Sequence, residues 1–123
     1  MKRDLELIRE LLLFFEEKQD DAPVEVPPIE GYSQYQIAYH LLLMHEAGFL
    51  HGERQRSLSD PERVISVIPF TLTWQGHEFL QSIKDDNMWR KLKEHVLKPS
   101  ASWSFAFIGE WIKHELKRTF GLG

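Results

Sequence analysis

The strongest constraint on how this chain folds is a run of four predicted elements, in the order helix, strand, strand, helix. Ser33 and Gln36 form a capping-box pattern that opens the first helix, and Gly48 follows its last turn, where a left-handed residue is favoured. Thr73 is placed to cap the helix after the strands. The order predicts a mainly α-helical domain with a small β-hairpin, in the α+β class. The strands are predicted at residues 49–55 and 64–73.

Apolar residues recur at helical spacing in the rest of the chain, and they predict a helix before this run, the continuation of the helix that closes it, and a C-terminal helix. Asp4 can cap the first of these, and the adjacent carboxylates of Asp85 and Asp86 are expected to interrupt the second with a cap or a turn. Three prolines between residues 22 and 31 exclude a helix there. The helices are predicted at residues 4–18, 74–97 and 102–120.

Length and composition restrict the class of protein. A chain of 123 residues, 42% of them hydrophobic, is long enough for one domain with a real core. We therefore predict a single domain over residues 1–123, with its core at about 1–97 and a C-terminal helix at about 102–120. There is no cysteine, which excludes disulfides, thiolate zinc sites and cysteine nucleophiles. No signal peptide or membrane-spanning run is visible, so we expect a cytoplasmic protein that does not bind membranes.

The charge distribution limits the partners. A formal net charge of −4 argues against a sequence-blind nucleic-acid binder, because such proteins gain affinity by neutralising phosphates. Residues 1–62 carry 6 basic and 13 acidic side chains, whereas residues 63–123 carry 9 and 6. An anionic partner would therefore bind the second half of the chain more favourably than the first.

The first helix of this run and the strand after it resemble a known DNA-binding pattern. The run from Ile37 to Leu50 is similar to the recognition helix and first wing strand of arsenic-repressor-type winged helices. Leu72-Thr73-x-x-Gly76 is placed like the motif that starts the helix after the wing in many bacterial regulators. The resemblance implies a winged-helix-like domain with a C-terminal helical extension. It is carried by Ile37, His40, Leu41, Glu46, Ala47 and Gly48.

The whole chain also resembles a family of short hypothetical proteins from bacteria and phages that is known only as a domain of unknown function. The resemblance covers nearly the full length, and it implies a family without implying an activity. The matching segments are Met1 to Asp4, Gly31-Tyr32-Ser33, Tyr39-His40-Leu41, Leu72 to Leu80 and Ile83 to Lys91.

The predicted recognition helix contains neither lysine nor arginine, and three prolines occupy the place of the short helix that precedes it in a helix-turn-helix. Glutamine can still hydrogen-bond base edges, and the hairpin arginines could contact phosphates. The predicted partner face consists of Gln36, Tyr39, His40, Arg54, Arg56 and Arg63, and Gln34, Tyr35 and His45 are further outward candidates on the helix.

Two functions remain open. We interpret the chain as a non-enzymatic binding module, a DNA-associated regulator in bacteria or phages that binds DNA weakly or at a specific sequence. The alternative is a protein–protein interaction adaptor that has lost DNA binding. We predict no catalytic residue, no cofactor and no metal site, because His40 and His45 stand five residues apart and do not converge as a pair spaced by four would.

The C-terminal helix predicts an oligomer. Its apolar face is wider than a surface helix needs to cover one domain. The flank around Phe107 and Trp111 would therefore remain exposed to solvent in a monomer. We therefore predict a homodimer through this helix.

In the helix that starts at Ser33, the stripe of Ile37, Leu41 and Met44 is predicted to face the core.

Overall fold

A computed structural model describes residues 2–24, 26–62, 64–97 and 103–121. It shows an α+β protein, with five helices and one antiparallel two-stranded hairpin in these ranges. The residues group into two compact units, 1–80 and 81–123, and we describe each by itself. The boundary between them lies inside a helix. None of the described helices combines the length and apolar character that crossing a bilayer requires.

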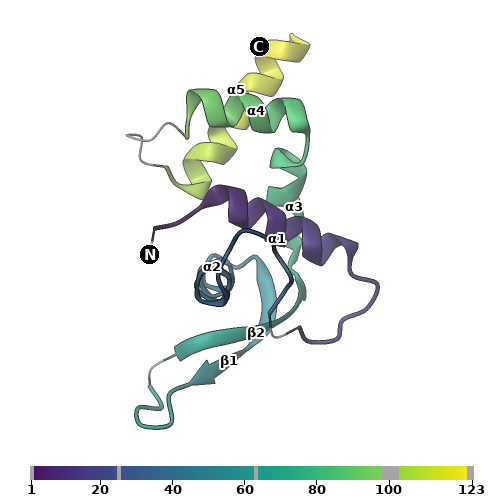
Figure 1. Ribbon diagram of the computed structural model, residues 1–123. Helices are drawn as coiled ribbons and strands as arrows, with labels where there is room; N and C mark the ends of the chain where they lie inside the picture. Colours follow the sequence, from purple (N-terminus) through teal and green to yellow (C-terminus); the bar gives the residue numbers. More distant parts are fainter. Residues whose placement is uncertain (1, 25, 63, 98–102, 122–123) are drawn as a thin grey trace. The chain divides into compact units, whose positions relative to one another are not determined.

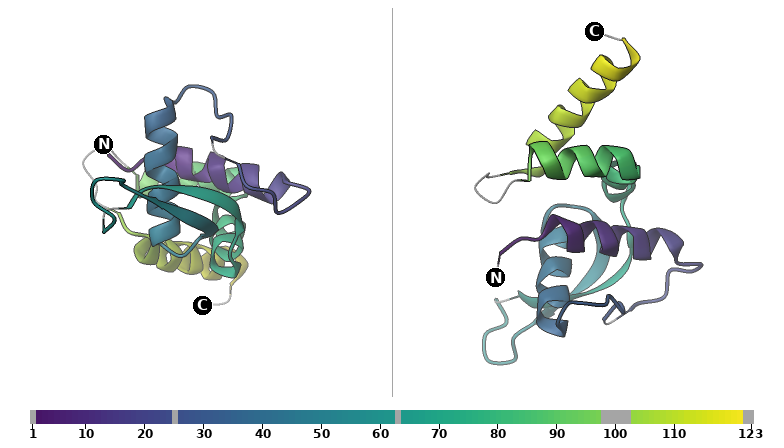
Figure 2. Two further views of the ribbon diagram at one scale, coloured as in Figure 1. Left: turned by 90° about the horizontal axis from the view of Figure 1, so that it is seen from below. Right: turned by 45° about the horizontal axis from the view of Figure 1, so that its top comes forward.

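The first unit consists of two helices and the hairpin, followed by most of a third helix (Figure 1). Both α1 and α2 pack against β2 and against each other. In the view from below, the hairpin crosses in front of α2, with α1 behind (Figure 2, left). The elements are α1 (Leu5–Glu17), α2 (Gln34–Glu46), β1 (Leu50–Arg56), β2 (Val64–Leu72) and α3 (Trp74–Ile83).

The helix caps predicted from the sequence are present. The Asp4 side chain accepts a hydrogen bond from the Leu7 backbone N–H at 3.2 Å. Ser33 Oγ accepts from the Gln36 backbone N–H at 3.1 Å, and Gln36 Oε1 accepts from the Ser33 N–H at 2.9 Å, which completes the capping box. Gly48 follows α2 with a φ of 82°, the left-handed conformation that glycine adopts without strain.

The motif that resembles the start of the helix after a wing has a clear structural role. Thr73 Oγ1 donates to the Gly48 carbonyl and accepts from the Gly76 N–H, and the Thr73 N–H donates to the Phe49 carbonyl at 2.9 Å. A Cβ on Gly76 would overlap the Phe49 carbonyl oxygen, so only glycine lets α3 approach this closely. The motif therefore joins the start of α3 to the junction between α2 and β1.

Pro69 marks a bulge in the hairpin, one of the few places where a strand accepts proline. The register runs from His51 opposite Thr71 to Gly52 opposite Pro69, which leaves Phe70 as an extra residue on β2. Gly52 is required beside the bulge, because a Cβ there would stand 2.7 Å from the Ile68 carbonyl oxygen.

The core of the first unit contains the predicted stripe of α2. Ile37, Leu41 and Met44 are all buried, with Leu41 only 1% exposed, and the prediction is confirmed. The other buried apolar side chains of this unit are Leu5, Leu7, Ile8, Leu11, Leu12, Phe15, Phe49, Leu50, Val67, Leu72, Phe79 and Leu80.

The second unit contains the end of α3 followed by α4 (Asp86–His95) and α5 (Phe105–Phe120), which pack together (Figure 2, right). The predicted break at the paired aspartates is confirmed, since the Asp85 side chain caps α4 by accepting from the Met88 N–H at 2.8 Å. The terminal helix begins at Phe105 with Ser104 as its cap. The predicted start at Ser102 lies outside the described residues, and the predicted end is confirmed by Gly121, whose φ is 67°.

Candidate binding face on α2 and the hairpin

The first turns of α2 present polar side chains to solvent. Gln34, Tyr35 and Gln36 are exposed, Tyr35 by 81%, and Tyr39 one turn later is half-buried. The Gln36 carboxamide oxygen is already engaged in the capping box. Amide and phenol groups of this kind can both donate and accept hydrogen bonds. The exposed turn can therefore form directional contacts with a polar partner.

His40 was predicted to face outward, and that prediction is wrong. Its side chain is 2% exposed, and its two ring nitrogens are both bonded inside the first unit. The Asp4 backbone N–H donates to Nε2 at 2.8 Å, and Nδ1 lies 2.7 Å from the Gln36 carbonyl oxygen. A carbonyl only accepts, so Nδ1 carries the proton and the imidazole is neutral. His40 therefore ties the start of α1 to α2 and is not available to a partner.

The spacing in α2 explains this burial. Ile37, His40, Leu41 and Met44 follow the pattern i, i+3, i+4, i+7 of a single helix face. His40 thus lies in the middle of the apolar stripe. The helical spacing in the sequence thus already indicated a buried His40, whereas the resemblance to a recognition helix indicated an exposed one.

A second structural group lies beside His40. Asp4 accepts a hydrogen bond from Leu7, and its carboxylate also interacts with Tyr32. Burial, followed by the negative charge of Asp4 and the hydrogen bond to it, raises the pKa of the Tyr32 phenol above its usual value. Tyr32 and Asp4 therefore stabilise the entry to α2 together with His40.

The C-terminal end of α2 lies close to the hairpin. His45 is half-buried, and its Nδ1 is a buried atom with no hydrogen-bond partner within the described ranges. Burial lowers the pKa of His45, and the positive charge of Arg54 lowers it further. The exposed Arg54 on β1 thus belongs to the same surface as the end of α2.

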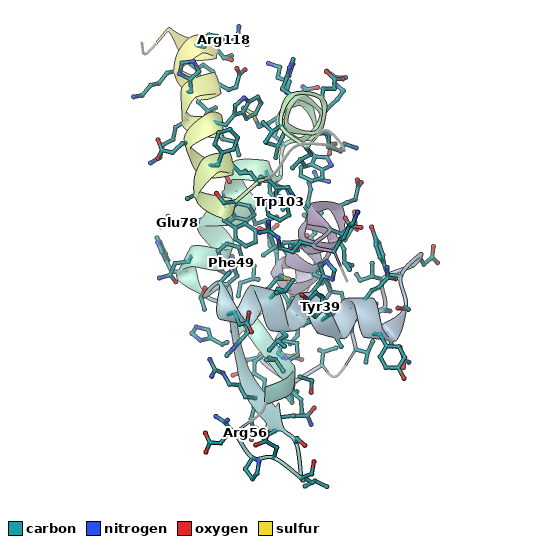
Figure 3. All side chains as sticks on the ribbon, turned by 90° about the vertical axis from the view of Figure 1, so that its left-hand side faces the viewer. Tyr39, Phe49, Arg56, Glu78, Trp103 and Arg118 are labelled. Carbon is teal, nitrogen blue, oxygen red and sulfur yellow. The ribbon has the colours of Figure 1, made fainter. Side chains whose placement is uncertain are left out.

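Of the other two hairpin arginines, only Arg56 lies within the described residues. Arg56 is exposed near the far end of the hairpin (Figure 3), and its guanidinium donates to the Pro61 carbonyl at 3.1 Å. Arg63 lies outside the described residues. Residues 50–64 hold these three arginines together with Glu53, Asp60 and Glu62, so the hairpin sequence carries no excess of positive charge.

Trp74 is an exposed aromatic residue that sequence patterns did not place on the surface. It is 75% exposed at the start of α3, and its indole N–H donates to the Glu78 carboxylate. The signal was present, because the residues three and four positions later, His77 and Glu78, are polar and offer no apolar face. His77, in the first turn of the same helix, is also exposed.

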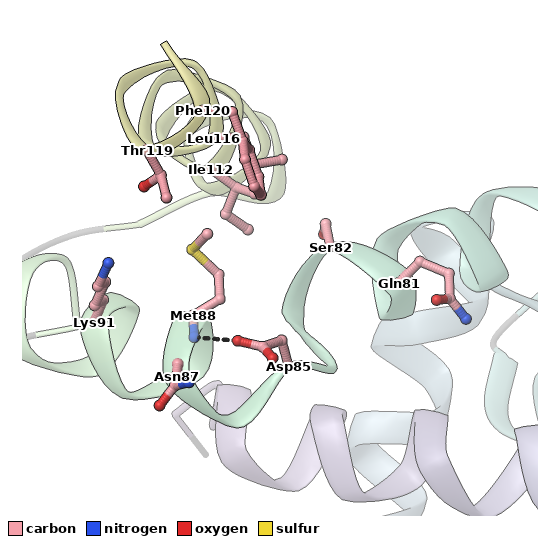
Figure 4. A pocket seen from close by; sticks show the side chains of 10 residues that line it. All are labelled: Gln81, Ser82, Asp85, Asn87, Met88, Lys91, Ile112, Leu116, Thr119 and Phe120. Carbon is pink, nitrogen blue, oxygen red and sulfur yellow. Dashed lines mark hydrogen bonds between the residues drawn. The ribbon is translucent and has the colours of Figure 1, made fainter. Parts of the chain in front are cut away.

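The second unit contains a cavity of about 380 Å³ between the end of α3, α4 and α5 (Figure 4). Met88 from α4 and Ile112, Leu116 and Phe120 from α5 line it with apolar atoms. Its polar edge includes the capping carboxylate of Asp85. Among the described residues, no group of three potential metal ligands comes together here or elsewhere.

Comparison with known proteins places the chain in a family. The family model described as "Hypothetical protein (DUF2513)" matches residues 2–102. The chain belongs to the DUF2513 family. The resemblance of the whole chain to a family known only as a domain of unknown function is thereby confirmed. The matched range includes the first unit and α4, and it ends before α5 begins.

A relative of the chain comes from Haemophilus influenzae. This uncharacterized protein is 33% identical to the chain over 109 residues, which cover 88% of this chain and 89% of the relative. No solved structure matches the chain. The comparisons therefore identify the family and assign no activity to it.

Proposed function

We propose that this DUF2513 protein is a non-enzymatic winged-helix-type module that associates with specific DNA through α2 and the hairpin. The observation that carries the proposal is the exposed first turn of α2, where Gln34, Tyr35 and Gln36 all face solvent. A recognition helix contacts base edges through its N-terminal residues. The hairpin follows α2 directly, as a wing follows a recognition helix.

The segment before α2 is bonded to the hairpin. The Val24 N–H donates to the Pro69 carbonyl at 3.1 Å, and Lys18 Nζ donates to the Phe70 carbonyl at 2.7 Å. These bonds hold the chain between α1 and α2 against β2, so the hairpin has a fixed place beside the start of α2.

The chemistry of the face assigns different roles to its residues. Glutamine can bond an adenine edge through two hydrogen bonds, so Gln34 is suited to base recognition. Arg54 and Arg56 are suited to phosphates, which position a protein without reading sequence. The absence of lysine and arginine from α2 and the net charge of −4 make generic duplex binding weak.

The test is selection of duplexes from a random pool by the full-length protein at physiological salt, followed by titration of the enriched duplex and a scrambled one. We expect enrichment of one sequence and a clear preference for it over the scrambled duplex. Gln34→Ala should reduce that preference. Arg54→Ala should weaken binding to both duplexes by the same factor. It should also reduce the slope of the logarithm of affinity against the logarithm of salt concentration by about 1.

Arg90→Ala is the matched control, because Arg90 is an exposed arginine on α4, in the second unit, and is not part of the proposed face. It should leave both affinities unchanged. A pool that shows no enrichment, or equal tight binding of every duplex, contradicts the proposal.

A specific observation also favours the adaptor alternative. Tyr35, Trp74 and Leu58 are all more than 70% exposed, and aromatic side chains are over-represented among the residues that dominate protein interfaces. Protein association through Tyr35 would depend little on salt and would be lost in Tyr35→Ala. DNA association would show the steep salt dependence of phosphate contacts.

A further inference from the structure

The outer flank of α5 carries a second kind of surface. Phe107, Trp111, His114 and Arg118 follow one another at intervals of four, three and four residues, which is the spacing of a coiled-coil seam. Phe107 is 54% exposed, and His114 and Arg118 are exposed as well. Trp111 is half-buried, because its ring stacks on His95 of α4 with a centroid separation of 6.4 Å. We call these four residues the α5 seam.

The α5 seam has an aromatic half and a basic half. Phe107 and Trp111 occupy its N-terminal part, and His114 and Arg118 occupy its C-terminal part (Figure 3 labels Arg118). Two seams of this kind are complementary only when the helices run antiparallel. Phe107 of one copy then faces Arg118 of the other, and Trp111 faces His114. A guanidinium over an aromatic face is favourable, so the contact is formed twice about a two-fold axis.

The flanking charges select the same orientation. Glu110 and Lys117 lie along one edge of the seam, at equivalent heptad positions seven residues apart. In an antiparallel pair, Glu110 of each copy faces Lys117 of the other. In a parallel pair, Arg118 would face Arg118 and Glu110 would lie near Glu115, so like charges would meet.

The contacts within one chain leave these groups accessible. The Glu110 and Lys113 side chains form an ion pair at 3.6 Å and are 76% and 73% exposed, so the pair is solvated and weak. Arg118 donates to Glu115 at 2.8 Å through the edge of its guanidinium, which leaves a planar face for stacking.

We propose that the α5 seam is the contact of an antiparallel homodimer, with a second copy of this chain as its occupant. The 16-residue helix is about 24 Å long. A pair of such helices buries less than the roughly 800 Å² per partner of a standard stable interface. The dimer should therefore dissociate at low micromolar concentration. The inference does not depend on DNA binding and stands apart from the proposed function.

The first test is sedimentation equilibrium of the full-length protein over a range of micromolar concentrations. We expect a mass that rises from 14.6 kDa toward twice that value as concentration increases. Phe107→Glu should raise the dissociation constant at least about tenfold. Phe120→Glu is the matched control, because Phe120 is 66% exposed on the same helix but lies outside the seam, and it should leave the constant unchanged.

The second test uses charge reversal and separates the seam from any general effect on folding. Glu110→Lys and Lys117→Glu should each weaken the homodimer about threefold to tenfold, because each places like charges opposite one another twice. Mixing the two single variants should restore association as a heterodimer, since a lysine on one copy then faces a glutamate on the other at both ends of the seam. Circular dichroism checks that each variant keeps its helices.

Either of two results overturns the proposal. One is a monomer of 14.6 kDa at every concentration. The other is a dimer that survives Phe107→Glu and the charge reversals but dissociates in Phe120→Glu, which would assign the contact to the opposite flank of α5.

Discussion

The helices α2 and α5 both have one buried and one exposed face, but they divide their side chains between those faces differently. In α2, the stripe that faces inward includes even a polar residue, His40, and both of its ring nitrogens are bonded. In α5, the fully buried stripe is narrow and consists of Ile108 and Ile112, while Phe107 and Phe120 remain more than half exposed.

Because of this difference, substitutions in α2 should change the stability of the fold, whereas substitutions on the exposed face of α5 should change the association of the protein. The side chains in the interior of the first unit are buried. Truncation of one of them therefore leaves a cavity or removes the partner of a buried polar group, and both outcomes destabilise the fold. The exposed aromatic residues of α5 contribute little to the fold of the monomer, so a change there should alter association instead. Matched substitutions at the two places test the division.

The largest expected effect is on the core of α2. Leu41→Ala should lower the free energy of unfolding by about 2–5 kcal/mol, because it removes a side chain that is 1% exposed. The paired change Phe107→Ala should alter it by no more than about 0.5 kcal/mol in the monomer. Urea denaturation at low protein concentration measures both. Equal losses for the two variants would contradict the division.

The next effect concerns the two histidines. His40→Leu should cost about 1–3 kcal/mol, because it removes the acceptor of the Asp4 N–H and the side-chain bond to the Gln36 carbonyl. His114→Leu replaces an exposed histidine on α5 and should change stability by less than about 0.5 kcal/mol. Thermal unfolding followed by circular dichroism compares them. A His40→Leu protein as stable as the wild type would show that the bridge between α1 and α2 contributes nothing.

The last comparison, in which the sign of the effect changes, concerns two helical glycines. Gly76→Ala should destabilise by about 1–3 kcal/mol, because its Cβ would overlap the Phe49 carbonyl. Gly109 of α5 has no atom within 4 Å of such a Cβ, so Gly109→Ala should stabilise by about 0.5–1 kcal/mol through helix propensity. The same unfolding experiment applies. Stabilisation by both changes would mean that α3 does not pack as closely as described.

Much of the fold could be predicted from the sequence because local chemistry sets it. The Ser33–Gln36 capping box, the left-handed glycines, the bulge at Pro69 and the cap at Asp85 each depend on a few consecutive residues. Such patterns limit the backbone before any tertiary contact forms. The family could also be recognised, because its segments extend over nearly the whole chain.

The candidate site was only partly predictable. Gln36, Tyr39, Arg54 and Arg56 were chosen by helical spacing and by likeness to a DNA-binding pattern, and the structure leaves Gln36 and both arginines exposed. His40 was misplaced, because polarity alone does not decide the exposure of an amphipathic ring. Such a ring goes where its neighbours on the helix and its hydrogen-bond partners allow.

The sequence by itself determined where the helices and strands begin and end, since caps, glycines and prolines act within a few residues. Only the tertiary structure decided which of these elements pack against one another. The bonds from His40 to Asp4 and the close approach of Gly76 to Phe49 join residues 36 and 27 positions apart. Contacts at that separation depend on how whole elements pack, and no local pattern encodes them.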